Sequence, residues 1–165
     1  MLSIRTILHP TDFSECSQYA FRLACALAEA HAGAIHLLHA APHPVISPVA
    51  GIVPPEPDRY EEELTVRLNA IRAGSSTIPL THQLIFSANP AGEIVRVAEA
   101  ITADLIVMGT HGRTGLRGLL MGSVAAQVVS KAPCPVLTVK LPLAESRSHE
   151  KPSPQPAHSP EAPTR

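Results

Sequence analysis

The stretch ADLIVMGTHGRTGLRGLLMGSVAAQVV (residues 103–129) joins an apolar run to a glycine-rich segment and then to a second apolar segment. Residues 105–108 are continuously apolar, which is typical of a parallel strand covered on both faces. The glycine-rich segment therefore leaves the carboxyl end of a strand, where open α/β sheets bind their ligands. We expect the rest of the chain to be arranged around this junction.

The glycines in this stretch have a regular spacing. Gly109, Gly112 and Gly122 form the pattern G-x-x-G-x9-G, and Ser123 follows directly. Glycine lets a backbone approach a ligand closely, and the free amides of a helix start, expected here at residues 122–124, attract an anion such as phosphate. The chain contains neither the P-loop pattern nor G-x-G-x-x-G. Spacing alone leaves open a surface loop that binds no ligand.

The pattern gains meaning beside PTDFS at residues 10–14 and APCPVLTV at residues 132–139. Together the three segments resemble the nucleotide-binding branch of the universal stress protein family, and the resemblance spans residues 3–140. A nucleotide-free branch of that family lacks the glycine pattern. The resemblance implies that the chain binds ATP, alone or with Mg²⁺, through Pro10, Thr11, Asp12, Ala40, Met108, Gly109, His111, Gly112, Arg113, Gly122, Ser123 and Val124.

The resemblance also implies separate roles within this set. Asp12 would contact the ribose hydroxyls, the backbone of Ala40 would meet the adenine edge, and Gly109 would lie beside the ribose. The amides of Gly112 and Gly122 would close on phosphate, together with the hydroxyl of Ser123. From the residues alone, Asp12 has a second interpretation as a carboxylate that caps the helix after it.

The hydrophobic pattern predicts a single α/β domain. Stretches with strand character at residues 4–9, 34–40, 79–86, 105–108 and 136–139 alternate with segments of helical periodicity. This alternation is typical of a doubly wound fold, with a five-stranded parallel sheet and helices on both faces. The family resemblance implies strand order 3-2-1-4-5. Pro133 and Pro135 place the last strand at a sheet edge.

Finer predictions concern the helices. Ser14 is expected to begin the first helix and Gly33 to end it, with an inner face of Ala20, Leu23, Ala24, Leu27 and Ala28. In the second helix, Glu63 and Arg67 are placed to pair, and Gly74 and Ser75 to end the helix. The helix after the glycine segment is expected to bury Val124, Ala125, Val128 and Val129.

Composition bounds the function classes. A length of 165 residues predicts one domain. A net charge of −1 and the absence of a basic run argue against binding to nucleic acid. No apolar run approaches the length of about 18 residues that a membrane span needs, and the start MLSIRTILHP lacks signal-peptide character. We therefore expect no membrane contact and a cytoplasmic location.

Cysteine and histidine usage predicts no metal site. The 3 cysteines show no C-x-x-C spacing, and the 9 histidines show no spacing of a known metal motif. Residues 141–165 are rich in proline and polar residues and cannot bury enough apolar surface to fold. We expect a nucleotide-binding domain at residues 1–140, followed by a disordered tail that has a second interpretation as a partner-binding segment.

Two function classes remain open at this point. One is a stress-response regulatory protein that binds ATP with little or no turnover, and the other is a nucleotide-free interaction or scaffolding dimer. An enzyme is the third interpretation, limited to slow ATP hydrolysis, because no carboxylate spacing of the Walker type is present and no catalytic residue is assigned. In the family the last strand pairs across a two-fold axis, which implies a homodimer through residues 136–139; any other protein partner is unknown.

Overall fold

The computed structural model describes residues 3–43, 57–110 and 121–141. Within these ranges the chain forms a parallel sheet of five strands in the order β3-β2-β1-β4-β5. The strands are β1 (Thr6–Pro10), β2 (Ala34–Ala41), β3 (Leu80–Phe86), β4 (Leu105–Gly109) and β5 (Val136–Val139). The predicted fold class and strand order are confirmed.

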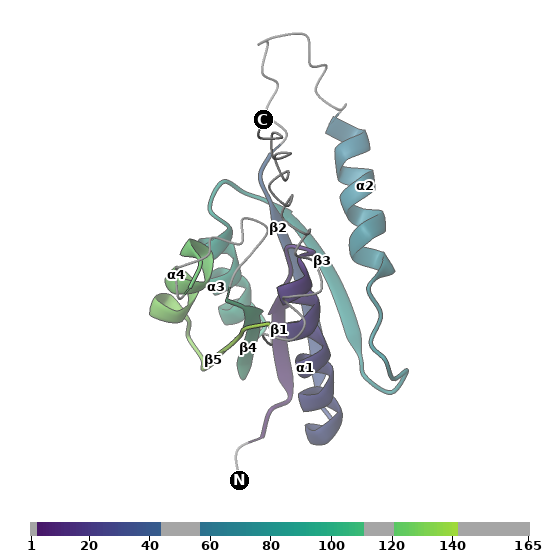
Figure 1. Ribbon diagram of the computed structural model, residues 1–165, viewed down its shortest axis with the longest axis vertical. Coiled ribbons are helices and arrows are strands. Elements are labelled where there is room, and N and C mark those ends of the chain that lie inside the picture. Colours follow the sequence, from purple (N-terminus) through teal and green to yellow (C-terminus); the bar gives the residue numbers. More distant parts are fainter. Residues whose placement is uncertain (1–2, 44–56, 111–120, 142–165) are drawn as a thin grey trace, which may run out of the picture.

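Helices cover both faces of the sheet. Figure 1 shows α1 (Glu15–His31) and α2 (Pro57–Ala70) on one face, and α3 (Pro90–Ala100) and α4 (Ser123–Lys131) on the other. The central strands β1 and β4 are buried between the two layers, so successive side chains enter opposite cores. Ile7 and Val107 belong to the core under α1, while Leu8 and Ile106 belong to the core under α3 and α4.

Two helix starts follow the chemistry of their capping residues. The hydroxyl of Ser14 accepts a hydrogen bond from the Ser17 amide at 3.2 Å, which begins α1 as predicted. The side chain of Asn89 accepts from the Gly92 amide at 3.1 Å, and Pro90 follows at the first helical position of α3. These caps fix where α1 and α3 leave the carboxyl edge of the sheet.

The end of α1 differs from the prediction. Ala32, not Gly33, adopts the left-handed conformation, with φ of 49°. Gly33 is required for another reason, because a Cβ at this position would lie 2.7 Å from the carbonyl oxygen of Ile4. The glycine lets the chain turn from α1 into β2 directly against the segment that leads into β1.

Several predicted helix faces and contacts were wrong. Leu23 on α1 and Val129 on α4 are 36% and 46% exposed, because the contact with the sheet is narrower than the apolar stripe of either helix. Helix α2 ends at Ala70, ahead of the glycine and serine expected to stop it. Arg67 does not pair with Glu63: its guanidinium lies 4.4 Å from the ring centre of Phe13, and Glu63 pairs with Arg59 at 3.2 Å.

Candidate functional site

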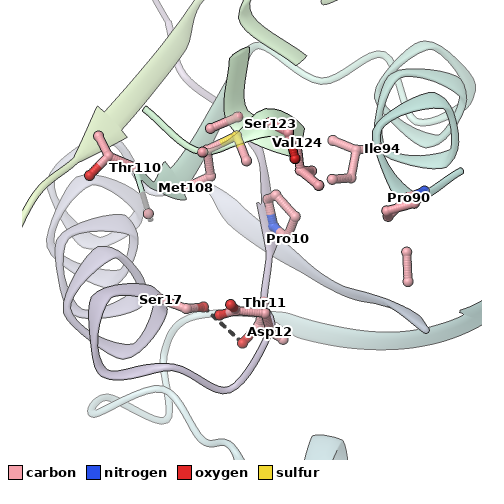
Figure 2. Close-up of a pocket in the computed structure, with 14 residues that line it drawn as sticks. Pro10, Thr11, Asp12, Ser17, Pro90, Ile94, Met108, Thr110, Ser123 and Val124 are labelled. Atoms are coloured by element: carbon pink, nitrogen blue, oxygen red, sulfur yellow. Dashed lines mark hydrogen bonds between the residues drawn. The ribbon is translucent and has the colours of Figure 1, made fainter. Parts of the chain in front are cut away.

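A pocket of about 230 Å³ lies at the carboxyl ends of β1 and β4. These two strands flank the point where the strand order of the sheet reverses, which is the usual ligand site of such folds. Figure 2 shows Thr11 and Asp12 on one side of the pocket, Ser123 and Val124 of α4 across from them, and Pro90 and Ile94 of α3 to one side. The site is therefore formed by segments from both halves of the chain.

The structure brings together most of the residues predicted for the site. Those lining the pocket are Pro10, Thr11, Asp12, Ala40, Met108, Gly109, Gly122, Ser123 and Val124. The other three predicted residues, His111, Gly112 and Arg113, lie outside the described part of the chain. Sequence reasoning missed the further lining residues Ser17, Pro90, Ile94, Thr110 and Ala125. Ser17 carried a detectable signal, since it lies one turn after Ser14, the helix cap at the end of the PTDFS segment.

The first turn of α4 presents unpaired amides to this pocket. Gly122 begins the helix and makes no side-chain capping bond, and the first bond of the helix backbone runs from the Ala126 amide to the Gly122 carbonyl at 3.0 Å. The amides of Ser123, Val124 and Ala125 precede that bond, and none has a hydrogen-bond acceptor among the described residues. A helix start of this kind attracts an anion through its amides and its dipole.

One expectation about these amides needs correction. The amide of Gly122 is not free, because it donates to the carbonyl oxygen of Thr110 at 2.7 Å. This bond holds the start of α4 against the end of β4. Within the described ranges, the amides without an acceptor begin one residue later, at Ser123.

Gly109 at the end of β4 has a structural reason to lack a side chain. A Cβ at this position would lie 3.0 Å from the Sγ of Cys16, 3.2 Å from the carbonyl carbon of Cys16 and 3.3 Å from the amide nitrogen of Ser17. The strand end thus packs directly on the first turn of α1. This contact accounts for the glycine without a ligand, so its predicted place beside a ribose remains a prediction.

Asp12 takes part in the cap of α1. Its Oδ1 accepts from the Ser14 amide at 3.0 Å and from the Ser14 hydroxyl at 2.6 Å, while Ser14 itself caps the helix. The interpretation of Asp12 as a residue of the helix cap therefore accounts for the bonds of its Oδ1. Asp12 also lines the pocket, so the residue that orders this turn is at the same time part of the candidate site.

Ala40 offers backbone groups at the same edge. Bonds from the Ala34 amide to the Arg5 carbonyl and from the Thr11 amide to the Leu38 carbonyl show that even-numbered residues of β2 turn their backbone groups toward β1. The pairing of the two strands stops at Pro10 and Leu38. The amide and carbonyl of Ala40 therefore point past the end of β1, where no described residue of β1 pairs with them.

Two buried histidines hold the segment that leaves β1. His9 is 1% exposed, and its Nδ1 donates to the carbonyl oxygen of Val107 at 2.7 Å. Loss of hydration lowers the pKa of His9 to about 4, although the bond to Val107 and the charge of Asp12 oppose this. The Nδ1 of His39 donates to the Thr11 carbonyl at 2.6 Å. The lowered pKa keeps His9 neutral, and both imidazoles bond to backbone carbonyls at the ends of neighbouring segments.

The described residues contain no cluster of His, Cys, Asp and Glu that could hold a metal ion. The cysteines lie in apolar or backbone contacts. Cys16 donates its thiol to the Val139 carbonyl at 3.2 Å, and burial raises the pKa of both Cys25 and Cys134. A raised pKa disfavours the thiolate, which is the reactive form. The arrangement thus offers apolar walls, a carboxylate, hydroxyls and free amides, which suit binding of a polar anionic molecule.

In the portions of the chain that the structure describes, no helix combines the length and apolar character needed to cross a bilayer.

Comparison with known proteins gives a consistent result. The Universal stress protein family matches residues 3–140. Universal stress protein MJ0531 of Methanocaldococcus jannaschii is 37% identical over 145 residues, covering 86% of this chain and 85% of the relative. A universal stress protein of Thermus aquaticus is 36% identical over 142 residues, covering 82% of this chain and 98% of the relative.

Solved structures agree with the sequence comparisons. Protein MJ0577, whose structure was used to assign its biochemical function, superposes with a TM-score of 0.60 at 30% identity, covering 84% of this chain and 97% of its own. Universal stress protein UspA from Lactobacillus plantarum superposes with a TM-score of 0.65 at 24% identity, covering 83% of this chain and 98% of its own. The second likeness bears on the fold alone.

Proposed function

The chain belongs to the universal stress protein family, and on that premise we propose that it is a stress-response regulatory protein that binds ATP in the pocket between β1 and β4. The observation that carries the proposal is the first turn of α4. Three consecutive amides, of Ser123, Val124 and Ala125, face the pocket without a capping side chain. Phosphate is the chemical group that such a turn binds most readily.

The adenosine half of the ligand fits the opposite side of the pocket. The amide and carbonyl of Ala40, which no described residue of β1 pairs with, provide one donor and one acceptor for the edge of a base. Pro10 and Ile94 provide apolar surface for its faces. Asp12 is placed to accept hydrogen bonds from ribose hydroxyls, and Gly109 also lines the pocket.

Family resemblance extends the proposed site into the segment outside the described residues. His111, Gly112 and Arg113 are assigned to the phosphate side, together with Gly122, Ser123 and Val124. Met108 also lines the pocket. Two solved members of the family were crystallised with adenine nucleotides, one with cAMP and one with dAMP, each at 24% identity to this chain. At that identity they support a shared fold, and the residues of the pocket support the choice of ligand.

We infer little turnover of the bound nucleotide. Hydrolysis needs a group that orients the attacking water and a metal ion positioned on the phosphates. Among the described pocket residues, Asp12 is the ionisable side chain, and its Oδ1 is engaged with Ser14. ATP, alone or with Mg²⁺, would then act as a bound signal in a cytoplasmic homodimer, and the nucleotide-free scaffolding dimer is the competing function.

The test is chemical identification of the nucleotide. Purified protein is denatured, the released small molecules are separated, and apo protein is then titrated with ATP and with GTP by calorimetry. Release or saturable binding of ATP is expected. GTP should bind more weakly, because guanine reverses the donor and acceptor at the edge that meets Ala40. A protein that releases no nucleotide and binds neither would be assigned to the nucleotide-free class instead.

A further inference from the structure

The hydroxyl of Thr11 is a polar group of the pocket that the fold holds in place. The backbone of Thr11 is fixed at both ends: its amide donates to the Leu38 carbonyl at 2.8 Å, and its carbonyl accepts from His39 at 2.6 Å. Thr11 as a whole residue is 6% exposed, and it lines the pocket. The position of the hydroxyl oxygen is therefore set by β2 and by the end of β1, before any ligand binds.

Two donors already occupy that oxygen. The Phe13 amide donates to the Thr11 Oγ1 at 3.1 Å, and the Ser17 hydroxyl donates to it at 2.9 Å. A hydroxyl has two acceptor positions and one hydrogen, so both acceptor positions are taken. The hydrogen of Thr11 is then left for a further partner, and Thr11 lines the pocket. Figure 2 shows Ser17 reaching toward Thr11 from α1.

The direction of the Ser17 bond decides this arrangement. Ser17 is 3% exposed and has one hydrogen to share between two neighbours, the Thr11 Oγ1 at 2.9 Å and the Nε2 of His9 at 3.5 Å. The first distance is near the optimum for two oxygens, while the second is at the limit of a hydrogen bond. The hydrogen of Ser17 therefore goes to Thr11.

The state of His9 agrees with this direction. Its Nδ1 hydrogen is used on the Val107 carbonyl, which can only accept. In the neutral ring the Nε2 then has no hydrogen, so His9 cannot donate to Ser17. The Nε2 can accept the Ser17 hydrogen, but at 3.5 Å it is a weaker partner than the Thr11 Oγ1 at 2.9 Å.

We propose that Ser17 is a positioning residue that fixes the Thr11 hydroxyl as a hydrogen-bond donor to the bound nucleotide. This inference rests on the nucleotide site proposed above and adds a specificity rule to it. The ligand must present an acceptor to Thr11, such as a ribose oxygen or a ring nitrogen, and an amino group at that place would be disfavoured. Ser17 itself need not touch the ligand.

The test is a double-mutant cycle on ATP affinity, measured by calorimetry with the full chain. Ser17→Ala keeps the Cβ and removes the hydroxyl that orients Thr11, and Thr11→Val replaces the Thr11 hydroxyl by a methyl of similar size. Each change should raise the Kd for ATP by about two- to tenfold, the effect of one hydrogen bond. In the Thr11→Val background, Ser17→Ala should have no further effect, because there is no hydroxyl left to orient.

Controls separate positioning from a general loss of structure. Ser130→Ala removes an exposed hydroxyl on α4 and should leave the Kd unchanged. All titrations are run well below the melting temperature of each variant. A purely structural role of Ser17 would weaken binding equally in both backgrounds.

The outcomes are distinct. If the wild-type chain binds ATP and Ser17→Ala binds it with the same affinity, the inference is overturned and the proposed nucleotide site stands. Fully additive effects in the cycle have the same consequence. Tighter binding in Ser17→Ala also overturns it, because that result would mean that Ser17 had been accepting the Thr11 hydrogen. A wild-type chain that binds no ATP overturns the proposed function and this inference together.

Discussion

Replacement of Gly109 by alanine tests whether the glycine at the end of β4 is required by the fold, by the ligand or by both. The added Cβ would lie 3.0 to 3.3 Å from atoms of Cys16 and Ser17, two of which belong to the backbone of α1. Backbone cannot move aside as a flexible side chain can, so β4 and α1 must separate by a few tenths of an ångström. Overpacking of this kind costs about 1 to 3 kcal/mol.

The expected effect is visible without any ligand. A loss of about 1 to 3 kcal/mol corresponds to a fall of roughly 2 to 12 °C in melting temperature for a domain of this size. The assay is urea and thermal unfolding of nucleotide-free protein, followed by circular dichroism. Gly74→Ala is the matched control, since a Cβ there meets nothing within 4 Å, and that variant should stay within about 0.5 kcal/mol of wild type.

The comparison has a clear refutation. If Gly109→Ala unfolds at the same urea concentration as Gly74→Ala, the close packing of β4 on α1 is not what requires the glycine. A loss of ATP affinity without a loss of stability would instead assign Gly109 to the ribose, as the family resemblance implies.

Three further predictions concern other parts of the molecule. Asp12→Asn should keep the bonds to Ser14 and hence the stability of apo protein, yet weaken ATP binding by about 1 to 3 kcal/mol by calorimetry, and unchanged affinity would limit Asp12 to capping. Asp104 accepts from the Thr6 and Arg5 amides, and these bonds lower its pKa below the usual 3.8. Its contribution to stability is therefore present above pH 3.8 and is lost as the pH falls through the lowered pKa. The difference in urea stability between wild type and Asp104→Asn should shrink over that fall in pH, and a constant difference would contradict this. Pro135 and Val139 bond toward β4, so the amide of Val136 faces the free edge of β5, and Val136→Pro removes it. This variant should dissociate the predicted homodimer in sedimentation, whereas Leu137→Pro should also unfold the sheet. A wild type that sediments as a monomer at micromolar concentration would refute the dimer.

The sequence was sufficient for the features that depend on local patterns. The apolar run at residues 105–108, the cap Ser14 and the prolines before the last strand each act through neighbouring residues, and the element predicted from each is present. Placement of the site at the strand ends followed from the same pattern. The pocket accordingly contains the predicted residues that the structure describes.

What the sequence did not predict depends on contacts between distant segments. The exposure of Leu23 and Val129 depends on how much of each helix contacts the sheet. The contact of Arg67 with Phe13 depends on where α2 lies relative to the start of α1. The amide of Gly122 donates to the carbonyl oxygen of Thr110, a residue twelve positions earlier in the chain. The position of Ser17 after the cap was a signal in the sequence, but its contact with Thr11 depends on how α1 packs beside the end of β1.

The most direct test of nucleotide binding is the thermal shift of the purified chain with ATP, compared with that of Gly122→Val. ATP at about a hundred times its Kd should stabilise the fold by about 2.7 kcal/mol and raise the melting temperature by roughly 5 to 10 °C. Gly122 has φ of −70° and ψ of 158°, which valine can adopt, so the variant should fold while its side chain enters the place of the phosphate. A shift in wild type that is absent in Gly122→Val is the predicted result, and no shift in wild type, or an equal shift in both proteins, would contradict the account.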